Sequence, residues 1–158
     1  MSQKAVYEFL ESVGFADRYV EFDENATATV ALAAAAIGCE EGRIAKTMSL
    51  STKEGPIVVV FMGTARLDNR KYKDTFGEKA RMLQGDDVLE QTGHPIGGVC
   101  PFALKEGVRV YLDESLRLYE YVYPAAGSTN NAVRLTIDEL EQITQGQWID
   151  VSKSLTEE

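Results

Sequence analysis

The segment from Gly93 to Phe102, GHPIGGVCPF, concentrates unusual backbone chemistry in ten residues. It holds three glycines, two prolines, the one histidine of the chain and one of its two cysteines. Glycine lets the backbone turn freely and approach a ligand closely, whereas proline fixes φ and removes an amide donor. A stiff loop of this kind can present main-chain N–H groups to an anion or a developing oxyanion. The same composition is also typical of a convoluted turn, and composition alone favours neither interpretation.

A lysine on the apolar face of a predicted strand is the second candidate for chemistry. Lys46 shares its strand parity with Ile44, Met48 and Leu50. Burying an unpaired ammonium is costly. Such a lysine therefore either points into a cavity, where it meets an anion, or extends its stem until the charge reaches water. The periodicity of the strand leaves both possibilities open.

Two side chains of the loop could themselves be reactive. His94 could act as a general base, but no Ser-His-Asp pattern accompanies it, and a histidine before proline also closes turns. Cys100 could be a nucleophile. Its neighbours Val99, Pro101 and Phe102 are apolar, however, which favours a small residue that lines a pocket. One histidine and two separated cysteines exclude a zinc site of the usual spacing.

The elements that must position these groups follow from caps, turn residues and hydrophobic periodicity. Helices are predicted at residues 2–13, 29–38, 68–76, 86–92 and 136–144, with Thr29 and Thr136 as caps. Strands are predicted at residues 19–22, 44–50, 57–62, 108–112, 119–123, 132–135 and 148–151. Hairpin connections outnumber helical crossovers in this order. The pattern therefore indicates an α+β fold, with a mixed, largely antiparallel, barrel-like sheet and helices outside it, in one domain over residues 1–158.

Charge and length limit the partners that this chain could have. Its net charge of −9 excludes a broad nucleic-acid surface, which needs many cations. Residues 65–84 nevertheless hold six cations against three carboxylates, which suggests a small anionic partner or one end of a nucleic acid. A solvated helix face is the simpler interpretation of the same run. No apolar run is long enough to span a membrane, and the N-terminus lacks a signal-peptide pattern, so we expect a cytoplasmic protein.

Taken in order, these motifs resemble the YbaK/EbsC family, also called the prolyl-tRNA synthetase-associated or editing-domain family. The resemblance covers residues 2–151. It rests on a threonine-capped helix, the strand sequence Ile-Ala-Lys-Thr-Met, an apolar strand, the Gly93–Phe102 loop and a small-residue loop before the last long helix. It implies a barrel-like mixed sheet and a free-standing trans-editing deacylase. Such an enzyme hydrolyses the ester of a mischarged aminoacyl-tRNA, often one that carries the wrong amino acid for its proline anticodon.

The resemblance also implies roles for individual residues. Lys46 would contact the phosphate or ribose of the terminal adenosine, and the amides of Gly97 and Gly98 would orient and polarise the ester carbonyl. Water, positioned by the ribose hydroxyl of the substrate, would be the nucleophile, since an activated ester needs mainly positioning and oxyanion stabilisation. The other substrate-binding residues implied are Thr29, Thr47, His94, Val99, Cys100, Pro101, Gly127 and Ser128. The cations expected to meet tRNA are Arg66, Arg70, Lys71 and Arg81.

The resemblance implies no metal and no other cofactor. Its expected partners are the acceptor end of aminoacyl-tRNA and a synthetase or elongation factor, and the chain would be a monomer or a homodimer. Two alternatives remain open: a non-catalytic module that binds aminoacyl-tRNA or an aminoacyl nucleotide, and a thiol enzyme that uses Cys100.

The chain also departs from the family pattern. Asn130-Asn131-Ala132-Val133 lacks an acid that some members carry, and Cys100 stands where relatives often have serine or threonine.

Overall fold

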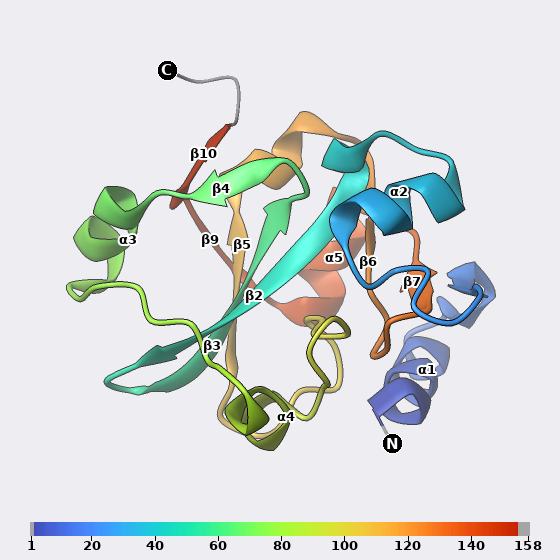
Figure 1. The fold of residues 1–158 in the computed structure, drawn as a ribbon, viewed down its shortest axis with the longest axis horizontal. Helices are drawn as coiled ribbons and strands as arrows, with labels where there is room; N and C mark the ends of the chain where they lie inside the picture. Colours follow the sequence, from blue (N-terminus) through green and yellow to red (C-terminus); the bar gives the residue numbers. More distant parts are fainter. Residues whose placement is uncertain (1, 155–158) are drawn as a thin grey trace.

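A six-stranded mixed sheet forms the centre of the computed structural model, which describes residues 2–154 (Figure 1). The strand order is β8-β6-β2-β3-β5-β9. The bounds are β2 Ile44–Thr52, β3 Gly55–Met62, β5 Arg109–Asp113, β6 Tyr121–Pro124, β8 Leu135–Thr136 and β9 Gln147–Ile149. Two short antiparallel pairs accompany it: β1 (Tyr19–Glu21) with β7 (Asn131–Val133), and β4 (Ala65–Leu67) with β10 (Ser152–Ser154).

Five α-helices surround the sheet in the described part of the chain. In Figure 1, α2 (Val30–Ile37) lies beside the upper right end of β2, α4 (Asp86–Thr92) lies at the bottom of the view, and α5 (Ile137–Thr144) lies behind the strands. The other two are α1 (Ser2–Ser12) and α3 (Asn69–Phe76). None of the helices formed by residues 2–154 has the length and apolar character needed to cross a lipid bilayer.

The helix ends follow from capping residues in the sequence. The Thr29 side chain accepts from the Leu32 N–H at the start of α2, and Gly38 ends this helix with φ of 84°. Thr136 forms a capping box with Glu139 at the start of α5. These side chains satisfy amides that a helix leaves without partners in its first turn. Thr29 thereby fixes where α2 begins, directly beside β2.

The sheet separates two of the three apolar clusters. Residues of α1, α5 and the Gly93–Phe102 loop pack on one face, where Leu10, Phe102 and Leu140 are buried. Tyr72 of α3 and Phe61 of β3 pack on the other. Every residue of β3 from Ile57 to Met62 is buried, as its continuous apolar run indicates for a central strand.

The structure confirms the α+β class and the mixed sheet. Four of the seven strand pairs are antiparallel, and the three parallel pairs all lie in the central sheet. The β4–β10 pair was not predicted, because both strands are only three residues long and neither Ala-Arg-Leu nor Ser-Lys-Ser shows a distinctive strand pattern. The predicted strand at 132–135 is divided into β7 and β8, which pair with different partners.

A buried carboxylate holds the segment that leads into β10 against the sheet. Asp113, at the end of β5, is fully buried. It accepts hydrogen bonds from the Ser115 N–H (2.9 Å), the Val151 N–H (2.8 Å) and the Ser152 hydroxyl. These bonds satisfy the charge and fix the segment that leads into β10, which pairs with β4.

Replacing Asp113 by alanine should therefore leave buried donors without acceptors. We expect the free energy of unfolding to fall by about 2–4 kcal/mol, measured by urea denaturation. Asp150→Ala is the matched control, because the Asp150 carboxylate is exposed and its ion pair with Lys71 should contribute at most about 1 kcal/mol. Equal effects of the two substitutions would contradict this account of β10.

Candidate active site

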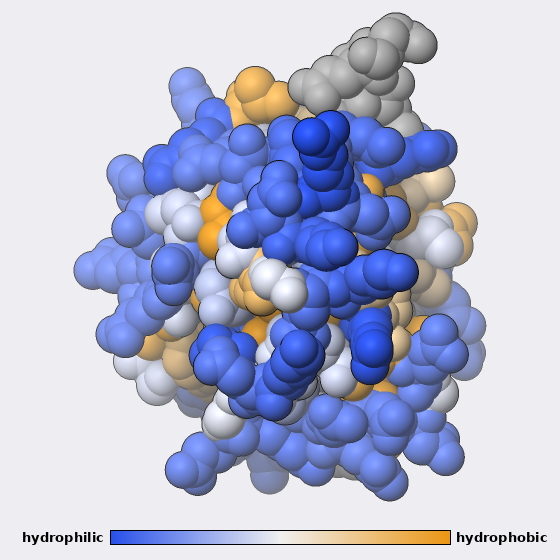
Figure 2. Space-filling model, turned by 90° about the vertical axis from the view of Figure 1, so that its left-hand side faces the viewer, coloured by the Kyte–Doolittle hydropathy of each residue, from blue (hydrophilic) through white to orange (hydrophobic). Residues whose placement is uncertain are grey.

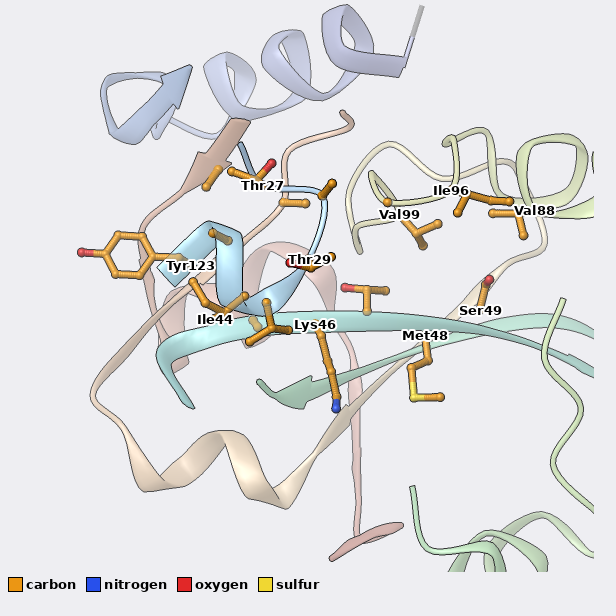
Figure 3. A pocket seen from close by; sticks show the side chains of 18 of the residues that line it. Thr27, Thr29, Ile44, Lys46, Met48, Ser49, Val88, Ile96, Val99 and Tyr123 are labelled. Carbon is orange, nitrogen blue, oxygen red and sulfur yellow. The ribbon is translucent and has the colours of Figure 1, made fainter. Parts of the chain in front are cut away.

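A pocket of about 380 Å³ lies beside β2 and collects residues from five separate segments (Figure 3). We call it the edge pocket. Its walls come from residues 27–33 at the start of α2, 44–49 of β2, 82–88, 96–99 of the glycine loop, and 123–132. Most of the lining is apolar. Lys46 is the one charged residue among the lining residues, and none of them is a carboxylate.

The pocket occupies a gap in the pairing of the outer edge of β2. β6 pairs with β2 through Ile44 and Ala45. Beyond the gap, the segment 81–83 is hydrogen-bonded to the same edge of β2. The Leu83 N–H donates to the Ser49 carbonyl (3.0 Å), and the Ser51 N–H donates to the Arg81 carbonyl (2.8 Å). No strand pairs with this edge between these two partners in the part of the chain that the structure describes. An open strand edge therefore forms the floor of the edge pocket.

The main chain of Lys46 is part of this floor, but its side chain lies on the face of β2 opposite to the glycine loop. Figure 3 shows it pointing away from Thr29 and Val99. Its ammonium donates to the Ala65 carbonyl at the start of β4. Burial lowers the pKa of the Lys46 ammonium, and the nearby Arg66 guanidinium lowers it further. The half-buried ammonium is held by a main-chain carbonyl, so it neither meets an anion in a cavity nor extends fully into water, and the role of Lys46 stays a prediction.

The glycine loop reaches the edge pocket through Gly97 and Val99, together with Ile96. Gly97 has a φ of +85°, which favours glycine. At Gly98 a Cβ would lie 2.8 Å from the Ser128 backbone, so this glycine permits the loop to touch the 125–131 loop. The Gly98 N–H donates to the Pro95 carbonyl (2.9 Å). Of the two amides expected to polarise an ester carbonyl, that of Gly98 is thus already engaged within its own loop.

His94 and Gly127 hold the loops together and lie outside the pocket lining. His94 is fully buried, with Nε2 donating to the Phe102 carbonyl (2.7 Å) and Nδ1 2.5 Å from the Ser2 hydroxyl. The same hydroxyl lies 2.7 Å from the Gly127 carbonyl. Ser2 of α1 therefore ties the glycine loop to the 125–131 loop. Ser128, Pro101 and Cys100 are also absent from the lining.

Cys100 lacks the properties of a nucleophile in this structure. It is fully buried, and burial raises the pKa of its thiol to about 12. The thiol contacts His94 Nε2 at 3.5 Å, but that nitrogen is committed to the Phe102 carbonyl. The attacking species in thiol chemistry is the thiolate, which such a group does not supply near neutral pH. The structure therefore gives no support to a thiol enzyme.

The four cations expected to meet tRNA lie on β4, on α3 and before residue 82. Arg66, Arg70 and Arg81 are exposed. Lys71 instead donates to the Ser152 carbonyl (2.8 Å) and pairs with Asp150 (3.2 Å). The surface on this side of the molecule is largely hydrophilic (Figure 2). Arg66 also lies close enough to Lys46 to affect its pKa, which connects this surface to the edge pocket.

Sequence reasoning missed several residues of the pocket. Thr27, Ser49, Leu83 and Val88 line it but were not singled out, and Asn131 was named only in a stretch that departs from the family pattern. Most of these side chains carry no distinctive motif and meet only through long-range folding. The Asn131 amide is fully used: it accepts from the Ala126 N–H (3.0 Å) and donates to the Ala126 carbonyl (3.0 Å) and the Tyr19 hydroxyl (3.1 Å). It therefore shapes the 125–131 loop.

The model of the aminoacyl-tRNA editing domain matches residues 24–143. The chain belongs to the aminoacyl-tRNA editing domain family. The match includes all five segments that build the edge pocket. Among residues 2–154, no group of three or more histidine, cysteine, aspartate or glutamate side chains could hold a metal ion.

Three similar proteins illustrate the relationship of this chain to other editing domains. The "Uncharacterized protein YwhH" of Bacillus subtilis (strain 168) is 49% identical over 132 residues, which are 82% of this chain and 84% of the relative. The "Putative Cys-tRNA(Pro)/Cys-tRNA(Cys) deacylase EbsC" of Enterococcus faecalis (strain ATCC 700802 / V583) is 31% identical over 75% of this chain and 74% of its own. A solved structure described as "a putative trans-editing enzyme for prolyl tRNA synthetase" superposes with a TM-score of 0.87 at 33% identity, covering 97% of this chain and 98% of that one.

Gly98 gives a test of the contact between the two loops. An alanine Cβ at this position meets main-chain atoms of Ser128, which can yield only if the loop moves. We expect Gly98→Ala to lower the free energy of unfolding by about 1–3 kcal/mol and to shift the amide resonances of residues 127–129. Gly107→Ala is the control for the resonances: its φ of +92° strains an alanine by itself, but its Cβ would meet no atom within 4 Å, so residues 127–129 should not shift. Unchanged resonances at 127–129 in Gly98→Ala would contradict the contact.

The pH dependence of stability tests the buried contacts of His94 with Ser2 and Phe102. Burial lowers the pKa of His94 in the fold below its ordinary value of about 6.5. The unfolded chain then binds the proton more readily. This pKa difference therefore adds to the free energy of unfolding. The addition is complete above about pH 6.5 and is lost as the pH falls towards the lowered pKa of His94 in the folded protein. Urea denaturation between pH 5.5 and 7.5 should show this loss in the wild type and a flatter profile in His94→Gln. Identical slopes would refute it.

Proposed function

We propose that this editing domain acts in trans as a deacylase that hydrolyses the ester bond of mischarged aminoacyl-tRNA, with tRNA bearing a proline anticodon as the first candidate. The observation that carries the proposal is the edge pocket itself. It joins one half-buried lysine to an apolar cavity that has open main-chain groups and no carboxylate or metal cluster among the described lining residues. Such a site is suited to an ester that is already activated. Membership of the editing family and the deacylase name of one relative support the same reaction.

The proposed reaction needs positioning more than a protein base. A water oxygen attacks the ester carbonyl carbon, the bond between that carbon and the ribose oxygen breaks, and a proton passes to the ribose oxygen. The products are a free amino acid and an uncharged tRNA. The neighbouring ribose hydroxyl of the substrate orients the water, main-chain N–H groups stabilise the oxyanion, and the Lys46 ammonium interacts with the phosphate or ribose of the terminal adenosine.

The acceptor end would enter along the hydrophilic surface that carries Arg66, Arg70 and Arg81. The overall charge of −9 opposes a long duplex contact, so the protein would hold only the tip of the tRNA. Proline–tRNA ligase of Pelobacter propionicus (strain DSM 2379 / NBRC 103807 / OttBd1) is 31% identical to this chain over 91 residues, which are 16% of that enzyme. This similarity supports a synthetase as a partner in the cytoplasm.

Lys46→Met tests the proposed function because it removes the ammonium and keeps an apolar stem. On a panel of mischarged tRNAs, the wild type should release free amino acid from at least one. The variant should lose about 100-fold or more in kcat/KM on that substrate. Lys53→Ala is the matched control, since Lys53 is exposed at the turn between β2 and β3 and lies outside the pocket lining.

Two outcomes would overturn parts of this proposal. Full activity in Lys46→Met would remove Lys46 from the site. Tight binding of a non-hydrolysable aminoacyl-adenosine by the wild type, with no release of amino acid from any tRNA of the panel, would identify a binding module instead of an enzyme.

A further inference from the structure

Thr47 lies at the floor of the edge pocket, where the pairing of β2 is interrupted. Its hydroxyl oxygen is buried and has no hydrogen-bond partner among residues 2–154. A buried hydroxyl without a partner is costly, which points to a ligand that supplies one. Because Thr47 lines the edge pocket, that ligand would be the one that enters the pocket.

The main chain of Thr47 faces the same gap. Along a strand, alternate residues direct their N–H and C=O to the same edge. Ser49 and Ser51 direct theirs towards the segment 81–83, since the Ser49 carbonyl accepts from Leu83 and the Ser51 N–H donates to Arg81. Thr47 therefore directs its N–H and C=O to this edge as well, at the point where neither β6 nor the segment 81–83 pairs with it.

An N–H and a C=O on one residue of an open edge form a defined recognition unit. In an antiparallel ladder, two facing residues exchange both hydrogen bonds, N–H to C=O in each direction. The aminoacyl group of a charged tRNA is chemically one residue: it offers an α-ammonium donor and an ester carbonyl acceptor on either side of one Cα. We infer that the aminoacyl group docks on Thr47 as a one-residue strand, with its ammonium on the Thr47 carbonyl and its ester carbonyl on the Thr47 N–H.

The composition of the pocket agrees with this arrangement. Among residues 2–154, no carboxylate lines the edge pocket to hold an ammonium, so neutral oxygens must accept its N–H groups. The Thr47 hydroxyl is a second acceptor beside the Thr47 carbonyl. The Thr47 N–H also supplies a donor to the ester carbonyl, a role for which the Gly98 amide is not free because it donates to Pro95. The inference rests on the proposed function, and it defines the substrate class as esters of α-amino acids with a free amino group.

Amide hydrogen exchange of Thr47 tests the inference without altering the residue. The probe is 3′-deoxy-3′-(alanylamino)adenosine, whose amide replaces the scissile ester and whose side chain is small. The matched control is the propanoylamino compound, which lacks only the α-amino group. In the free protein, the Thr47 amide should exchange faster than those of Lys46 and Met48, which face β3. At 100 times the Kd, the alanyl probe should slow Thr47 exchange on the order of 100-fold.

Equal affinity of the alanyl and propanoyl compounds would contradict the contact between the ammonium and the Thr47 carbonyl, since the propanoyl compound keeps the carbonyl that faces the Thr47 N–H. Three further results would overturn the inference: no protection of Thr47 at saturation, failure of the alanyl probe to bind, or equal protection by adenosine. The last result would assign the edge to the nucleoside. Continued release of amino acid from tRNA in any of these cases would leave the proposed function standing.

Thr47→Val gives a second readout, because it removes the hydroxyl and keeps the main-chain groups. It should weaken the alanyl probe about tenfold and leave the affinity for the propanoyl probe unchanged. Equal losses for both probes would assign the hydroxyl to packing and would contradict its role as an acceptor for the ammonium.

Discussion

The architecture of the site depends on the incomplete pairing of one strand. A β-strand in the middle of a sheet normally has partners on both edges, because unpaired main-chain groups away from water are costly. β2 has β3 along its whole length on one edge, but on the other it has β6 at Ile44 and Ala45 and the segment 81–83 from Ser49 onward. The intervening residues keep an open edge. The start of α2 and the glycine loop enclose that edge, so it becomes the floor of a pocket.

Several contacts elsewhere in the structure hold the walls of the edge pocket in place around this gap. Thr29 fixes the start of α2 through its cap, and Gly97 and Gly98 let the glycine loop approach residues 128 and 129 closely. Ser2 of α1 contacts both His94 and the Gly127 carbonyl, so a helix distant from the pocket joins its two loops. Several of these residues resemble catalytic groups in type, yet their contacts in the structure connect one loop or helix to another. A motif can therefore mark a site through the scaffold it builds.

The sequence predicted those parts of the fold that local chemistry determines. α2 was predicted from Thr29 and Gly38, the hairpin of β2 and β3 from the turn residues between two apolar runs, and α5 from the Thr136 cap. Long-range pairings were harder: β4 and β10 are short and almost ninety residues apart. The contact of the Lys46 ammonium with the Ala65 carbonyl could not be predicted either, because β4 comes beside β2 only through the fold. The engagement of the Gly98 amide and the open main chain of Thr47 depend on pairing registers that no local pattern encodes.

Positioning of an aminoacyl ester at the open edge of β2 is the central claim of this account. A crystal structure of the protein with 3′-deoxy-3′-(alanylamino)adenosine tests it most directly. The account predicts that the acyl carbonyl oxygen lies within hydrogen-bond distance of the Thr47 N–H, with the adenosine extending towards Lys46. An acyl group bound outside the gap between Ala45 and Ser49, or a nucleoside base paired with Thr47 in its place, would contradict it.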